Sequence, residues 1–178
     1  LDDPRIRTFR ASGGGVCAAR NVALDAARGE LVAYLDDDNR MDPHWLKAVV
    51  LTFAGFPDAR ACYGARVIDD EGRLFRGTPA GAAWVHFDPW DAEAVRADNR
   101  VDMNAIAHRR SDARFDADLA YYGDWDLLLQ LTAGHAPVEV PAVAAYYRTD
   151  VPGRMSSTLA PEEIDREYRR VREKLSVD

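Results

Sequence analysis

Three consecutive aspartates, Asp36 to Asp38, follow the apolar run ELVAYL at residues 30–35 and precede a proline-led helix. The run predicts a buried strand, and open α/β sheets bind ligands at the carboxyl ends of their strands. Adjacent carboxylates repel one another, and a bound divalent cation would relieve that repulsion. Carboxylate oxygens suit Mg²⁺ or Mn²⁺, which are commonly shared with substrate phosphates. The spacing therefore predicts a metal and phosphate site, with a solvated acidic turn that caps the next helix as the alternative.

The first part of the chain predicts a strand–helix–strand unit that would position these aspartates. Residues 5–9 can form a short strand, residues 16–28 a helix, and residues 30–35 a central strand covered on both faces. The predicted apolar face of the helix consists of Val16, Ala19, Ala23 and Ala26.

The next helix is predicted to begin with Asp42 as its N-cap and Pro43 in its first turn. The side chains that it should bury are Trp45, Leu46, Val49 and Phe53. Further on, the pattern predicts strands at 59–69, 101–109 and 137–147, a helix at 124–134 and a C-terminal helix at 160–176. This last helix should dock through a stripe formed by Ile164, Tyr168, Val171 and Leu175.

Residues 77–100 are rich in Gly, Pro and Trp without a persistent period, which predicts a long loop.

The chain of 178 residues is long enough for one α/β domain. Its net charge of -7 argues against nucleic-acid binding. Cys17 and Cys62 are expected to be reduced thiols. With only two lysines and no apolar run that could cross a bilayer, we expect a bacterial protein that is cytoplasmic or peripheral to the inner face of the membrane.

Residues 15–46, GVCAARNVALDAARGELVAYLDDDNRMDPHWL, resemble the centre of family 2 glycosyltransferases of the GT-A fold. The resemblance continues through VDMNAIAHRR at 101–110 and YYGDWDLLLQL at 121–131, and so covers most of residues 5–148. It implies a single GT-A domain over residues 1–178, with a mixed, mostly parallel central sheet flanked by helices. It also implies an inverting, metal-dependent transfer of a sugar from a nucleotide diphosphate to a hydroxyl acceptor, which could be a saccharide, a lipid-linked molecule or a small molecule.

In this resemblance Asp36 and Asp38 correspond to the two ends of the DxD motif. Asp38 would hold the Mg²⁺ or Mn²⁺ that bridges the donor diphosphate, and Asp36 would contact the ribose or the metal shell. Asp37 is the variable middle position of the same nucleotide-sugar site. Arg20, in the ARN segment, is expected to reach the nucleotide.

The segment GDWD at 123–126 resembles the family's Glu-Asp motif, and this makes Asp124 the expected catalytic base. Gly123 stands where the family has glutamate. A simple helix cap is the alternative for Asp124, and Asp126 is the next candidate base. Trp125 and His108 are expected to contact the acceptor.

The resemblance further implies that the family's N-terminal, nucleobase-binding strands are missing from residues 1–178, so that the domain would be incomplete. Arg148 or Arg154 could supply a cation to the diphosphate. Two alternatives stay open. One is a magnesium-dependent phosphohydrolase or phosphotransferase, although Arg40 stands where that class usually has a small hydroxyl residue. The other is a non-catalytic homologue that binds nucleotide sugars.

Overall fold

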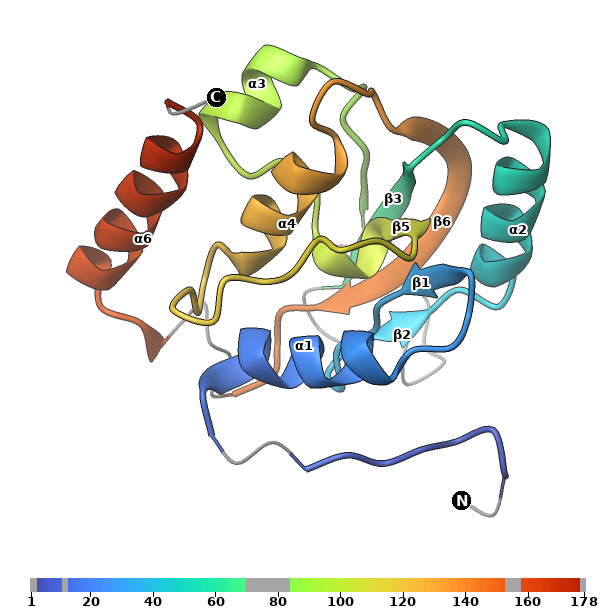
Figure 1. The fold of residues 1–178 in the computed structure, drawn as a ribbon, viewed down its shortest axis with the longest axis horizontal. Helices are drawn as coiled ribbons and strands as arrows, with labels where there is room; N and C mark the ends of the chain where they lie inside the picture. The colour runs from blue at the N-terminus through green and yellow to red at the C-terminus, as the bar shows by residue number, and fades with distance from the viewer. Residues whose placement is uncertain (1–2, 11–12, 70–83, 153–157, 177–178) are drawn as a thin grey trace.

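The computed structural model describes residues 3–10, 13–69, 84–152 and 158–176. A curled six-stranded sheet forms its centre, with helices on both sides (Figure 1). In chain order the elements are α1 (Gly15–Ala26), β1 (Leu31–Ala33), β2 (Arg40–Met41), α2 (Trp45–Gly55), β3 (Ala61–Asp69), β4 (Trp84–His86), α3 (Ala92–Ala97), the 3-10 helix η1 (Met103–Ala105), β5 (Ile106–Arg109), α4 (Gly123–Leu131), β6 (Val138–Arg148) and α6 (Pro161–Lys174).

The sheet is mixed, with the strand order β1-β5-β3-β6-β2 and with β4 paired to β3. Among the described strands only β3 and β6 pair in parallel, and all the other pairings are antiparallel. The expected mixed sheet is therefore confirmed, but the expectation that it is mostly parallel is wrong. The order of the strands depends on pairing between distant segments, which the local pattern does not reveal.

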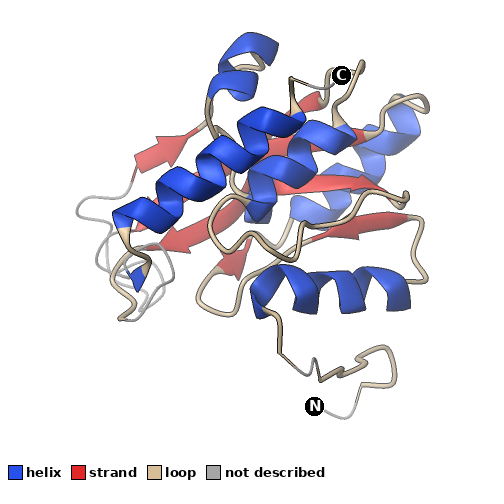
Figure 2. Cartoon of the chain, turned by 60° about the vertical axis from the view of Figure 1, so that its left-hand side comes forward, coloured by secondary structure: helices blue, strands red, loops and turns tan. Residues whose placement is uncertain are grey.

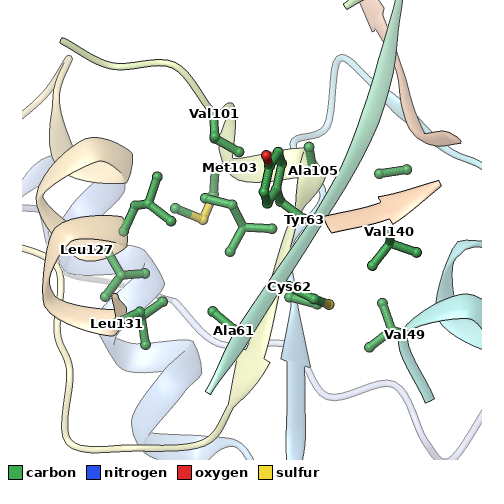
Figure 3. Packing of buried hydrophobic residues seen from close by; sticks show 14 of the residues in the cluster. Val49, Ala61, Cys62, Tyr63, Val101, Met103, Ala105, Leu127, Leu131 and Val140 are labelled. Carbon is green, nitrogen blue, oxygen red and sulfur yellow. The ribbon is translucent and has the colours of Figure 1, made fainter. Parts of the chain in front are cut away.

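Side chains of β3 alternate between the two faces of the sheet, as the pleat requires. Ala61 and Tyr63 face the side of α4, whereas Cys62 faces Val49 of α2 (Figure 3). Gly64 on the same strand allows its neighbours to approach closely. A Cβ atom there would lie 2.8 Å from the Trp45 ring and 2.8 Å from a backbone oxygen of β6. The β3–β6 pair is thus the rigid centre to which both helical layers attach.

Helix α2 covers one side of the sheet, and α3, α4 and α6 lie on the other side (Figure 1). Trp45, Val49 and Phe53 are buried at the predicted spacing of four residues, but Leu46 is 53% exposed. Leu46 points away because successive side chains on a helix are about 100° apart.

The predicted N-cap of α2 is also displaced. The helix begins at Trp45 with His44 as its cap residue, and the Asp42 carboxylate accepts the backbone N–H of His44 at 2.8 Å. Asp42 therefore orders the turn before the helix rather than capping the helix itself.

The N-terminal elements differ most from the prediction. Residues 5–9 form no strand and run as a loop (Figure 2). Strand β1 covers only Leu31–Ala33, is partly buried, and lies at one end of the strand order instead of in the centre. These two findings correct the predicted strand–helix–strand unit.

Helix α1 presents a different face to the core than expected. Cys17 and Leu24 are buried, whereas Ala19 and Ala23 are exposed. The Asn21 amide fixes this rotation, because it donates to the backbone oxygen of Phe115 at 2.8 Å and accepts the backbone N–H of Phe115 at 2.9 Å. The polar residue Asn21 thus determines which face of α1 packs against the core, and this face differs from the one that the apolar periodicity predicted.

The C-terminal helix is confirmed as α6, and its predicted stripe is the docked side. Val171 is fully buried, and Tyr168 packs with it against Trp125 and Leu119. Of the predicted 77–100 loop, the described part contains only β4 and the short α3; residues 70–83 lie outside the described residues. No helix within the described ranges is long and apolar enough to cross a bilayer.

Candidate active site

A cleft of about 930 Å³ opens where β1, the start of α4 and the end of β6 meet. It is lined by the three aspartates after β1, by Arg20 of α1, by Asp124 of α4 and by Arg148 of β6. Residues that lie far apart in the chain and that the sequence singled out for nucleotide binding and catalysis therefore share one cavity. Trp125, Asp126 and His108 do not line it.

Asp36 is held from two sides. Arg20 Nη2 lies 2.6 Å from Asp36 Oδ1, and Asn104 Nδ2 donates to Asp36 Oδ2 at 2.9 Å. The backbone N–H of Asp36 donates to Asn104 Oδ1 at 2.7 Å. Both carboxylate oxygens and the main chain of Asp36 thus have fixed partners, which gives this residue a single orientation at the end of β1.

Asn104 connects this contact to a second acidic residue in the cleft. Its side chain and its backbone N–H both donate to Asp102 Oδ1, at 2.8 and 2.9 Å. The other oxygen of Asp102 lies 3.1 Å from Arg66 Nη1 on β3. The contacts run from Arg20 through Asp36, Asn104 and Asp102 to Arg66, so that each of the two carboxylates has a cation and the Asn104 amide beside it.

Asp37 is exposed, whereas Asp38 is partly buried in the cleft. The next residue, Asn39, is buried and accepts the backbone N–H of Arg148 at 3.1 Å, which ties the aspartate turn to the end of β6. The pKa of Arg148 is raised, chiefly by its hydrogen bond to Asp150 and further by the charges of Asp69 and Asp38. Arg148 therefore stays cationic beside Asp38. Arg154 lies outside the described residues.

The carboxylates of the aspartate turn fit a metal ion that is shared with a substrate. They do not fit a metal site whose ligands all come from the protein. In the described part of the chain no three His, Cys, Asp or Glu side chains converge as metal ligands. The oxygens of Asp36 are already engaged by Arg20 and Asn104. Mg²⁺ is often bound through one or two carboxylates, and phosphates and water supply its other ligands. Asp38 and the residues beside it offer enough carboxylate oxygens for such a site.

Asp124 lies in the first turn of α4 and faces the same cleft. Its Oδ1 accepts Asn99 Nδ2 at 3.0 Å and the backbone N–H of Trp125 at 2.8 Å. Burial and the nearby charge of Asp102 raise the pKa of Asp124 to about 6, although these two hydrogen bonds and Arg20 lower it. A carboxylate with this pKa is mostly ionised at neutral pH and can still take up a proton, as a general base must.

The space beside Gly123, the residue that the resemblance aligns with the family's glutamate, is filled. A Cβ atom at Gly123 would lie 2.2 Å from Cys17 Sγ and 3.7 Å from a ring carbon of Phe115. A side chain there would overlap the Cys17 thiol unless one of the two residues shifted. Burial raises the pKa of the Cys17 thiol to about 11, so it is a neutral packing group.

The expectation that Trp125 contacts the acceptor is wrong for this structure. The side chain is 0% exposed, and its indole N–H donates to the backbone oxygen of Val95 at 2.7 Å. It stacks on Tyr168, with ring centroids 5.5 Å apart. The reserve base Asp126 is likewise buried, and its oxygens accept hydrogen bonds from Lys174 and Gln130. On a helix these two side chains face the core when Asp124 faces the cleft.

His108 is not available to an acceptor either. It is 1% exposed on β5, and its ring stacks on Tyr34. Its Nε2 lies 2.7 Å from the Tyr34 hydroxyl and its Nδ1 lies 2.7 Å from the backbone oxygen of Arg109. Burial lowers the pKa of His108, so it is a neutral core residue.

Sequence reasoning missed much of the cleft wall: Arg66, Asn99, Asp102, Asn104 and Tyr147 all line the cleft or bond to its aspartates. The available signal was the pair Asp102 and Asn104, two polar residues within the otherwise apolar run VDMNAIA, and both prove to be hydrogen-bonded.

Comparisons with known proteins show the family and the fold of the chain. The model of the family described as Glycosyl transferase family 2 matches residues 2–112. The protein y4gI of Sinorhizobium fredii (strain NBRC 101917 / NGR234) is 32% identical over 133 residues, which are 72% of this chain and 14% of y4gI. EpsH of Bacillus subtilis (strain 168), whose name assigns it to the glycosyltransferases, is 30% identical over 71 residues, 40% of this chain and 21% of EpsH. The chain thus spans about a fifth or less of the length of these relatives.

Two crystal structures of S. aureus TarS share the fold at 17% sequence identity. The structure of TarS residues 1–349 has a TM-score of 0.50, covering 76% of this chain and 40% of that one. The other has a TM-score of 0.54, covering 89% of this chain and 27% of TarS. The expected GT-A architecture, a mixed sheet flanked by helices, is confirmed. The chain belongs to glycosyl transferase family 2.

Proposed function

We propose that this domain transfers a sugar from a nucleotide diphosphate to a hydroxyl acceptor, with inversion at the anomeric carbon and with Asp124 as the base. The observation that carries the proposal is the shared cleft, which holds the Asp36–Asp38 turn together with Asp124. A donor bound at the aspartate turn and an acceptor beside Asp124 could therefore meet in one cavity.

The donor side of the proposal rests on fixed groups. Arg20 and Asn104 orient Asp36 toward the nucleotide, and Arg148 offers a cation to the diphosphate. A Mg²⁺ or Mn²⁺ ion held by Asp38 would offset the charge that develops on the departing diphosphate. Asp36 acts in this scheme as an oriented contact, since its oxygens already accept hydrogen bonds.

On the acceptor side, Asp124 takes the proton from the attacking hydroxyl group. The acceptor oxygen forms a bond to the anomeric carbon as the bond from that carbon to the diphosphate oxygen breaks, and the diphosphate leaves with the electron pair. Direct displacement from the opposite face inverts the configuration. A positioned base of this kind contributes about 10²–10⁴ in rate.

The phosphohydrolase alternative requires Asp36 to attack phosphorus as a free nucleophile. Arg20 and Asn104 occupy both of its oxygens, which disfavours that role. A non-catalytic homologue that binds nucleotide sugars would keep the aspartate turn and would not depend on Asp124, so substitutions at the two places separate it from the enzyme.

The test uses the full-length protein with Mn²⁺ and a panel of UDP-, GDP-, dTDP- and CDP-sugars. Asp124→Asn should bind the preferred nucleotide in calorimetry as the parent does and lose at least about 10²-fold in transfer. Asp38→Ala should lose the Mn²⁺-dependent part of nucleotide binding. The exposed Asp112→Asn serves as the matched control and should behave as the parent. Transfer by Asp124→Asn at the parent rate would refute the base, and unchanged Mn²⁺-dependent binding by Asp38→Ala would refute the metal site.

A further inference from the structure

Glu167 of α6 has its carboxylate on three consecutive backbone N–H groups. Oε1 accepts from Ala120 at 2.8 Å, and Oε2 accepts from Tyr121 at 2.8 Å and from Tyr122 at 3.1 Å. One ionised side chain thus satisfies three donors that precede α4. Hydrogen bonds to a charged acceptor contribute more to stability than hydrogen bonds between neutral groups.

The segment that Glu167 holds forms a wall of the cleft. Ala120, Tyr121 and Tyr122 line the cleft together with Asp124, and they lead directly into the first turn of α4. An acceptor hydroxyl that gives its proton to Asp124 must lie beside these residues. The rings of Tyr121 and Tyr122 pack edge to face, with centroids 4.8 Å apart, so the main chain under them also sets where both rings lie.

Helix α6 is itself firmly attached, so it can act as a fixed support. It lies beside α4 on the same side of the sheet (Figures 1 and 2). Lys174 bridges Asp116 and Asp126 at 2.7 Å each, and Arg170 pairs with Asp116 at 2.9 Å. Burial alone would raise the pKa of Asp116. The hydrogen bonds from Arg170 and Lys174 outweigh burial and hold this pKa below its usual value. Both ends of the loop from Asp116 to Asp126 are therefore tied to α6.

We propose that Glu167 is a positioning residue for the acceptor side of the cleft: it holds the main chain of residues 120–122 so that Asp124 and the two tyrosines meet the acceptor in one geometry. The proposal rests on the proposed transfer function. It assigns a role in acceptor use to α6, which lies outside residues 2–112 that match the family. The donor contacts at Asp36 and Arg20 come from other elements and do not involve Glu167.

The experiment compares Glu167→Gln with Glu173→Gln in the full-length protein. Glutamine has nearly the same shape but presents an NH₂ group where one oxygen was, so at least one of the three N–H groups loses its acceptor. Glu173 is exposed on the same helix, and its substitution makes the same change of charge. Two measurements are made: amide hydrogen exchange in a peptide covering residues 120–122, and separate KM values for donor and acceptor.

In Glu167→Gln we expect amide exchange at residues 120–122 to be about tenfold faster, with exchange in β3 unchanged, since about 1.4 kcal/mol corresponds to a factor of ten. We expect kcat over acceptor KM to fall about tenfold while donor KM stays within about twofold, since only acceptor-side geometry is disturbed. Glu173→Gln should match the parent throughout.

Exchange at residues 120–122 that equals that of Glu173→Gln overturns the proposal whatever the activity. Faster exchange with unchanged acceptor kinetics, or an equal rise in donor KM, overturns the positioning role. A parent protein that transfers no sugar overturns the proposed function and with it the acceptor role. Hydrogen exchange needs no enzymatic activity and still reports whether Glu167 holds residues 120–122. It therefore distinguishes a failure of the proposed function from a failure of the proposed role of Glu167.

Discussion

Replacing Asp124 by asparagine is expected to make the folded protein more stable at neutral pH, because the ionised carboxylate is held in an unfavourable environment. Burial and the charge of Asp102 together outweigh the hydrogen bonds from Asn99 and Trp125. Asparagine keeps an acceptor oxygen for both donors and removes the charge. The substitution that removes the base should therefore increase the free energy of unfolding.

The magnitude and its pH dependence follow from the two pKa values. A change from 3.8 to about 6 corresponds to at most about 3 kcal/mol. Because the carboxylate is partly open to water in the cleft, we expect about 1–2 kcal/mol. The stability that protonated Asp124 gives is fully present below pH 3.8 and is lost as the pH rises through 6. The advantage of Asp124→Asn should thus be near zero at pH 3.8, grow between these values and level off above pH 7.

Urea unfolding of the full-length protein at several values between pH 4 and pH 8 measures this difference, with Asp112→Asn as the exposed control. A difference between Asp124→Asn and the parent that is the same at pH 4 and pH 8 would refute the reasoning. So would a loss of stability at pH 8. The measurement does not need a substrate, and its outcome is independent of the proposed reaction.

Two further substitutions test the surroundings of Asp124. Asn99→Ala removes a hydrogen bond that favours the ionised carboxylate, so the acid limb of the pH profile of kcat/KM should move up from near 6 by about half to one pH unit; an acid limb that stays or moves down contradicts this. Gly123→Ala should cost about 1–3 kcal/mol in urea unfolding because its Cβ would overlap Cys17 Sγ. Adding Cys17→Ala, which leaves only a Cβ atom 3.9 Å away, should recover most of that loss, and a double variant as unstable as Gly123→Ala would exclude this contact as the cause.

The sequence identified those parts of the site whose signal is local. The Asp36–Asp38 turn follows the predicted strand at residues 30–35, and Asp124 precedes a run of apolar helical positions. For Asp124 this local pattern left a simple helix cap open, and the resemblance to the family's motifs favoured the base. The docked stripe of α6 was found in the same way, since its apolar positions repeat with the helical period.

What could not be predicted depends on contacts between distant segments. Asn104 bonds to Asp36 across 68 positions of the chain, and no local pattern records that contact. Trp125 and His108 lie next to promising residues, but packing against Tyr168 and Tyr34 takes them into the core. Arg20 lines the cleft beside Asp36. The apolar face assigned to its helix was nevertheless wrong, because the Asn21–Phe115 contacts determine the rotation of α1.

The close contact between Gly123 and Cys17 also limits the order in which the two positions can change in evolution. Any side chain introduced at 123 while the thiol is present meets an overlap, whereas a change of Cys17 to a smaller residue leaves room for a later change at 123. The two positions are therefore epistatic. A larger residue at 123 is therefore expected to cost less stability if Cys17 has first been replaced by a smaller residue.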